Sequence, residues 1–110
     1  MNNITITTTY IPVKNCTEIT HLKVELYYSM GGWNYFTSQQ EPRGYYLSVM
    51  PVKKWRSETG CTCEQFVAFQ GVRTLIKAVA RKSKKAESEA IALAENKEQE
   101  LIEHIKEKLT

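Results

Sequence analysis

Hydrophobic and polar residues alternate along much of the first half of the chain. The clearest case is HLKVELYYSM, residues 21–30, in which every second residue from Leu22 onward is hydrophobic. Because the side chains of a strand point alternately to opposite faces, this period of two predicts a β-strand. The same pattern predicts strands at residues 4–10 and 45–52.

Short polar segments separate these strands. The Gly-Gly pair at residues 31–32 predicts a tight turn, since glycine tolerates the positive φ that hairpins require. Residues 33–37 (WNYFT) then predict a returning strand, and residues 38–44 a polar loop. Residues 63–69 (CEQFVAF) fit either a last strand or the opening of a helix, and the strand is the preferred interpretation.

The period changes after this segment. Four hydrophobic residues recur with the spacing of one helix face: Val72, Leu75, Ile76 and Val79. They predict an amphipathic helix, and Ser83 can cap a second helix that runs to about residue 108. The chain is therefore predicted to be a single α+β domain over residues 1–110. An antiparallel sheet of three to four strands lies within residues 1–70, and two helices follow within residues 71–109, the last of which can extend from the body.

Two Tyr-Tyr pairs must divide between the two faces of the predicted sheet. Tyr28 and Tyr45 fall on the Leu/Val face, which predicts that they belong to the core. Tyr27 and Tyr46 fall on the other face, where lysines accompany them. Such a face can stack the bases of single-stranded nucleic acid, but cross-strand tyrosine pairs or a covering helix explain the pattern equally well.

Cations gather in two segments of the chain. The first segment contains no acidic residue and holds six cations: Arg73, Lys77, Arg81, Lys82, Lys84 and Lys85. The second cluster surrounds Trp55 and consists of Lys53, Lys54 and Arg56. On a helix, the first set would form a ridge suited to phosphate groups. A solvated helix face is the simpler alternative, and a second copy of the chain could also occupy the ridge.

Charge is divided unevenly along the sequence. Residues 1–86 hold twelve Lys or Arg and five Glu, a net charge of +7, whereas residues 87–110 hold three Lys and seven Glu, a net charge of −4. The pattern predicts a basic body and an acidic terminal helix. A homodimer formed through that helix is one consequence of this division.

Few residues suit catalysis or metal binding. The twelve acidic residues are all Glu, which excludes triads and phosphoryl-transfer motifs that need Asp. Cys61 and Cys63 have a single residue between them, whereas zinc sites usually have two to four, so neither a metal nor a cofactor is expected. The chain is expected not to be an enzyme. The sequence contains no signal-peptide pattern and no apolar run long enough to span a membrane, so a cytoplasmic location is expected.

Three segments carry a resemblance to known proteins: NYFT…EPRGYYLSVMPV (residues 34–52), FVAFQGVRTLI and RKSKKAESEAIALAE. Together, over about residues 22–95, they resemble small uncharacterised accessory proteins encoded on bacterial phages and conjugative or integrative elements. KSKKAESEA is also similar to the start of the helix in arm-site DNA-binding domains of phage-type integrases. The resemblance implies a small accessory factor that contacts nucleic acid, a host protein or a protein of the element.

These observations lead to two hypotheses about function. The first is a non-enzymatic accessory protein that binds DNA or RNA through the cations above, assisted by Tyr27, Tyr46 and Trp55. The second is a protein-interaction module, an adaptor or inhibitor, that uses exposed aromatic residues around Trp33 and Trp55 or the acidic helix.

Overall fold

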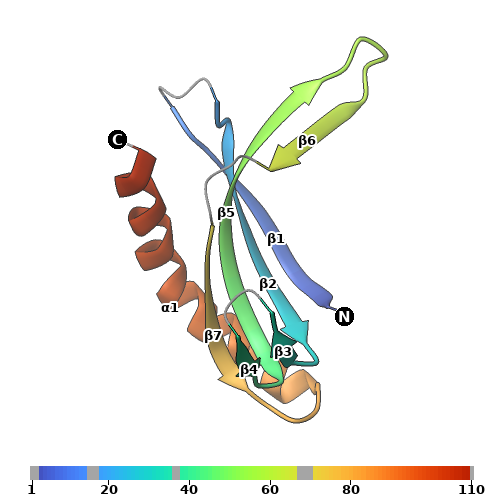
Figure 1. Cartoon of the computed structure of the whole chain (residues 1–110), viewed down its shortest axis with the longest axis vertical. Coiled ribbons are helices and arrows are strands. Elements are labelled where there is room, and N and C mark those ends of the chain that lie inside the picture. Colours follow the sequence, from blue (N-terminus) through green and yellow to red (C-terminus); the bar gives the residue numbers. More distant parts are fainter. Residues whose placement is uncertain (1–2, 15–17, 36–37, 67–70, 110) are drawn as a thin grey trace.

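The computed structural model describes residues 3–14, 18–35, 38–66 and 71–109. Figure 1 shows a tall, curved sheet with one helix along its side. The elements in chain order are β1 (Ile4–Pro12), β2 (His21–Ser29), β3 (Gly32–Asn34), β4 (Gln39–Glu41), β5 (Gly44–Arg56), β6 (Thr62–Phe66), β7 (Val72–Ala78) and α1 (Lys84–Leu109).

Strand β5 organises the main sheet. It is 13 residues long and pairs with β2 on one side, and β2 pairs in turn with β1. On its other side, the first part of β5 pairs with β7 and the last part with β6, and every pairing is antiparallel. The end of β5 and β6 form a two-stranded hairpin that projects from the body, and we call it the arm (Figure 1).

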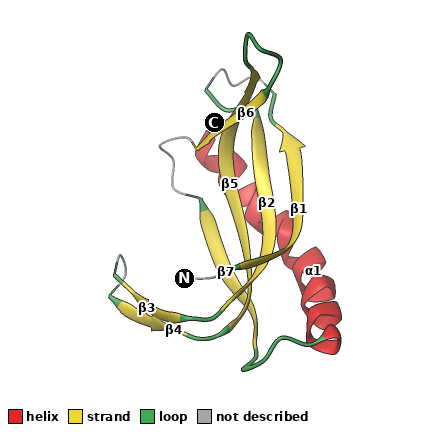
Figure 2. Cartoon of the chain, turned by 90° about the vertical axis from the view of Figure 1, so that its right-hand side faces the viewer, coloured by secondary structure: helices red, strands yellow, loops and turns green. Residues whose placement is uncertain are grey.

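A second, two-stranded sheet is formed by β3 and β4, in which Gly32 lies opposite Glu41. Figure 2 shows that this hairpin and α1 lie on opposite sides of the main sheet. Gly31, just before β3, has φ of 74°, a conformation that glycine adopts without steric cost. The Gly-Gly pair therefore turns the chain away from β2 and starts the hairpin.

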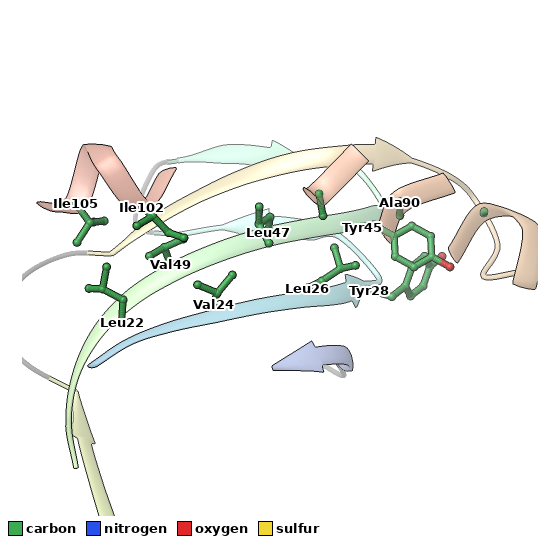
Figure 3. Packing of buried hydrophobic residues seen from close by; sticks show 12 residues of the cluster. Leu22, Val24, Leu26, Tyr28, Tyr45, Leu47, Val49, Ala90, Ile102 and Ile105 are labelled. Carbon is green, nitrogen blue, oxygen red and sulfur yellow. The ribbon is translucent and has the colours of Figure 1, made fainter. Parts of the chain in front are cut away.

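The core lies between α1 and one face of the main sheet. The helix contributes small residues near its start and larger ones near its end, namely Ala86, Ala90, Ala94, Ile102 and Ile105. Figure 3 shows Ala90 close to the rings of Tyr28 and Tyr45, and the two isoleucines over Leu22 and Val49. Alanine lets the helix approach the bulky rings closely, and isoleucine fills the space over smaller side chains.

The predictions of two helices and of a sheet of three to four strands were wrong. Residues 72–78 form strand β7, and the main sheet has five strands in the described part of the chain. The apolar spacing of this segment fits a helix, but β-branched residues such as Val72, Thr74 and Ile76 also favour a strand. Strand β5 presents an edge that β7 fills, and the register shifts where β7 passes Tyr45 and Tyr46. That shift disturbs the alternation and explains why a period of two was not evident in the sequence.

Three predicted strands and the second predicted helix are confirmed. The strands at residues 4–10, 21–30 and 45–52 are confirmed as parts of β1, β2 and β5, and the helix capped by Ser83 is confirmed as α1. The Ser83 Oγ accepts a hydrogen bond of 3.1 Å from the Ala86 N–H.

Two further predictions were wrong. The segment predicted as a loop, residues 38–44, contains β4, and the Leu/Val face of the sheet is covered by α1 and not by the predicted first helix. The predicted strands at 33–37 and 63–69 are present as β3 and β6, but residues 36–37 and 67–70 lie outside the described residues.

Candidate functional site

The predicted ridge of cations does not exist, because its members lie on a strand, a turn and the start of α1. The side chains of Arg73 and Lys77 engage carboxylates from different parts of the fold. Arg73 forms an ion pair with Glu41 of β4, and the Lys77 Nζ lies 2.8 Å from a carboxylate oxygen of Glu89 in α1. The hydrogen bond and charge of Lys77 lower the pKa of Glu89. These two cations therefore stabilise the fold and do not line one open surface.

Tyr27 and Tyr46 share the sheet face opposite α1, as predicted, but they are buried. Their exposed fractions are 7% and 4%, and their rings stack with centroids 5.8 Å apart. The Arg73 guanidinium lies 5.0 Å from the ring centroid of Tyr46 and donates a hydrogen bond of 3.3 Å to the Tyr27 hydroxyl. Burial, with a smaller contribution from Tyr27, raises the pKa of Tyr46. The two rings are not available to stack with bases.

A polar network ties the base of the arm to the body. Tyr10 of β1 donates a hydrogen bond of 2.8 Å to Glu64 of β6, and the Lys23 Nζ of β2 lies 3.3 Å from the other carboxylate oxygen. The Lys54 ammonium of β5 lies 3.6 Å from the centroid of the Tyr10 ring. Partial burial acts to raise the pKa of Glu64, but the hydrogen bonds from Tyr10 and Lys23 outweigh it and lower that pKa. Through its contact with the Tyr10 ring, Lys54 also helps to join the arm to the body.

The outer part of the arm is exposed. Three residues near the end of β5 have exposed side chains: Lys53, Trp55 and Arg56. Cys63 lies on the opposite strand, β6, and Cys61 lies just before that strand. The Cys63 thiol is 3.8 Å from the Cys61 carbonyl oxygen. Within the described residues, no group of three metal-ligating side chains comes together. Cys16 lies outside those residues.

Four cations of the predicted ridge are exposed at the end of the molecule opposite to the arm. We call these four residues the basic turn. Two of them follow β7 and the other two are the first residues of α1: Arg81, Lys82, Lys84 and Lys85. Among the described residues they form no ion pair within 4 Å, although the charge of Lys85 contributes to the lowered pKa of Glu89. In Figure 1 the arm and this turn lie at opposite ends of the long axis, which extends 43 Å. The predicted site residues therefore do not form one surface.

Among the residues whose exposure the structure describes, the most exposed aromatic side chains lie on the two hairpins. Trp33 and Tyr35, in and just after β3, are 48% and 84% exposed, and Trp55 on the arm is 42% exposed. Sequence reasoning identified both tryptophans but gave no role to Glu41 or Glu64. The polar run Ser38, Gln39 and Gln40 could have indicated a hairpin that leaves Tyr35 in solvent. The carboxylate partners had no such signal, because they lie far from their cations in sequence.

Comparison with known proteins leaves the family undetermined: no family model, curated protein or solved structure matches the chain. The resemblance of residues 22–95 to mobile-element proteins stays a prediction. No helix in the described part of the chain is long and apolar enough to cross a membrane.

Proposed function

We propose that this chain is a non-enzymatic protein-interaction module that binds its partner through the exposed aromatic side chains of its two hairpins. The observation that carries the proposal is the exposure of Trp33, Tyr35 and Trp55, while the tyrosines of β2 and β5 are buried. Tryptophan and tyrosine are the residues that most often anchor protein interfaces, since each can bury a large area at low cost in side-chain entropy.

The fold supports this role by holding both hairpins firmly at their bases. Arg73 joins hairpin β3–β4 to β7 through Glu41, and the network around Glu64 joins the arm to β1 and β2. A hairpin that is already oriented loses less conformational freedom on binding, so more of the contact energy contributes to affinity. An adaptor or inhibitor needs no catalytic residues for such a role.

The test is affinity capture from cells that naturally carry this chain, after nuclease digestion of the extract. We expect a defined protein that the wild type retains and that Trp33→Ala or Trp55→Ala loses. Leu93→Ala is the matched control, because Leu93 is an equally exposed apolar residue on α1. Capture of the same proteins by all four chains, or of none by the wild type, would contradict the proposal.

Intrinsic fluorescence gives a direct measurement once a partner is in hand. Trp33 and Trp55 are the two tryptophans of the chain, one on each hairpin. In the free protein we expect red-shifted emission that acrylamide quenches readily. Binding should shift the emission to shorter wavelengths and protect it from quenching, and Trp33→Phe and Trp55→Phe assign the change to one hairpin. Emission that does not respond to a bound partner would place the interface elsewhere.

Nucleic-acid binding is a second candidate, favoured by the exposure of the basic turn. Its cations could neutralise up to about four phosphates, and log K would then fall with log salt concentration with a slope of up to about −3.6. Fluorescence anisotropy with single- and double-stranded DNA and RNA tests it, using Arg81→Ala/Lys82→Ala/Lys84→Ala. The matched control is Lys53→Ala/Arg56→Ala on the arm. Absence of binding at low salt would remove this candidate.

A further inference from the structure

Strand β7 has an edge without a neighbouring strand. It pairs with β5 on one side, and within the described residues no strand pairs with its other side. Such an edge presents backbone N–H and C=O groups that can pair with another chain. Leu75, at the middle of β7, is 40% exposed, which adds an apolar side chain to this edge.

Opposite charges lie beside the two ends of β7, from α1 at one end and from the basic turn at the other. Beside its first residues, a groove of about 520 Å³ separates β7 from the later turns of α1. The helix side of this groove carries Glu100, Glu103 and Glu107 against a single lysine, Lys97, which already pairs with Glu100 at 3.0 Å. At the other end of β7, the basic turn begins three residues after Ala78. One end of the edge is therefore acidic and the other is basic.

This distribution makes the edge complementary to itself. Helix α1 runs back along the sheet in the direction opposite to β7, so the later turns of the helix accompany the start of the strand (Figure 1). If two copies paired their β7 strands antiparallel, a two-fold axis would reverse one copy relative to the other. The glutamates of each copy would then lie beside the basic turn of its partner, and this contact would occur twice.

We propose that two copies of this chain associate edge to edge through β7, with the acidic later turns of α1 in one copy next to the basic turn of the other. The two main sheets would join into one, and both helices would lie on the same side of it. The two copies of Leu75 would approach each other near the two-fold axis. The association goes beyond the hairpin-mediated binding proposed above, because it uses a different surface.

Strand β1, at the opposite edge of the main sheet from β7, lacks this complementarity. Strand β1 has its own groove against α1, lined by Glu95 and Glu98, but it does not lead into a cluster of exposed cations. It also contains a bulge between Thr5 and Thr7 and ends at Pro12, two features that discourage pairing with another strand. The two edges therefore offer a test and its matched control.

The interface would be small. Stable complexes usually bury roughly 1,200–2,000 Å² in total, more than one strand edge and its flanking charges provide. The association is therefore expected to depend on protein concentration and to weaken as salt screens the charges. Sedimentation equilibrium from low to high micromolar concentration should show a monomer–dimer equilibrium at low salt. A monomer at every concentration at low salt would overturn the proposal.

Charge exchange tests the arrangement itself. We expect Glu103→Lys/Glu107→Lys and Lys84→Glu/Lys85→Glu each to weaken self-association by roughly tenfold or more, because like charges then face each other. An equal mixture of the two variants should associate again, since both contacts of the mixed dimer regain opposite charges. Glu95→Lys/Glu98→Lys makes the same change of charge on the β1 side and should associate like the wild type. Failure of the mixture, or equal loss in the control, would overturn the assignment to β7.

Hydrogen exchange tests the edge without any substitution. Backbone amides of β7 should become more protected as protein concentration rises, while those of β1 should not change. Protection that grows at β1 instead, or at neither edge in a dimeric sample, would also overturn the proposal. These outcomes do not depend on Trp33 or Trp55, so they are distinguishable from failure of the hairpin proposal.

Discussion

Arg73 and Lys77 illustrate how far the role of a residue depends on its neighbours. They are four residues apart, which on a helix would place them on one face, yet they pair with carboxylates on opposite sides of the sheet. Arg73 also lies against the stacked rings of Tyr27 and Tyr46. A guanidinium with an ion pair, a hydrogen bond and a ring contact contributes to stability and is poorly placed to bind a phosphate as well.

Glu64 allows a prediction about pH at the same scale. Its pKa in the folded protein is lowered, so its contribution to the free energy of unfolding is present above its unfolded pKa, near 4.5, and is lost as pH falls through the folded pKa. Glu64→Gln should therefore reduce the free energy of unfolding by about 1 kcal/mol or less at neutral pH. The difference from wild type should disappear in acid.

Urea unfolding at neutral pH and at about pH 3 checks this expectation. The lower pH is below the ordinary pKa range of glutamate. Glu58→Gln is the control, because Glu58 lies in the exposed turn of the arm. A loss that is the same at both pH values, or an equal loss in the control, would show that the carboxylate of Glu64 does not hold the arm.

At the scale of the element, β7 and the start of β5 depend on close backbone contact. Gly44 lies opposite Ala78, at the point where β5 begins. A Cβ at position 44 would lie 2.3 Å from the Lys77 carbonyl oxygen and 2.9 Å from the Ala78 Cα. Because both atoms belong to the backbone of β7, they cannot move aside without disturbing the pairing. Glycine at this position therefore permits β7 to lie where it does.

Gly44→Ala should accordingly destabilise the protein by about 2 kcal/mol or more, since the clash cannot be relieved by a side-chain rotation. Gly60→Ala is the control: it also has positive φ, but a Cβ there meets nothing within 4 Å, so we expect a cost of about 1–2 kcal/mol. Chemical denaturation measures both. A smaller effect for Gly44→Ala than for Gly60→Ala would be inconsistent with β7 as a strand beside β5.

For the whole molecule, one core joins the helix to the sheet, and the charged and aromatic surfaces lie outside it. The arm, the hairpin β3–β4 and the basic turn all project from this body (Figures 1 and 2). Glutamates of α1 line the groove beside β7 and the groove beside β1. The hairpin surface proposed for a partner is therefore separate from the β7 edge proposed for a second copy.

Because helix and sheet share this core, they should unfold together. Ile105 is buried over Leu22 and Val49, and Ile105→Ala should lower the free energy of unfolding by about 2–4 kcal/mol. Leu93→Ala, at an exposed position on the same helix, should change it by no more than about 0.5 kcal/mol. Far-ultraviolet circular dichroism of the helix and near-ultraviolet signals of Tyr28 and Tyr45 should give the same midpoint. Separate midpoints would contradict a shared core.

The sequence by itself determined the features that depend on neighbouring residues. Alternation located β1, β2 and β5 and divided each Tyr-Tyr pair between the two faces, because the direction of a side chain on a strand is a local property. The cap at Ser83 was equally local, since its oxygen bonds a backbone N–H three residues away. The two exposed tryptophans also followed from their positions beside turns.

Only the tertiary structure determined that residues 72–78 form a strand and which carboxylates the cations around them contact. Their pattern fits a helix as well as a bulged strand, and the free edge of β5, almost thirty residues earlier, favours the strand. Burial of Tyr27 and Tyr46 likewise required Arg73, and the ion pairs of Arg73 and Lys77 required Glu41 and Glu89. Contacts between distant parts of a chain leave no periodic signal in the sequence, which is why the predicted basic ridge was wrong.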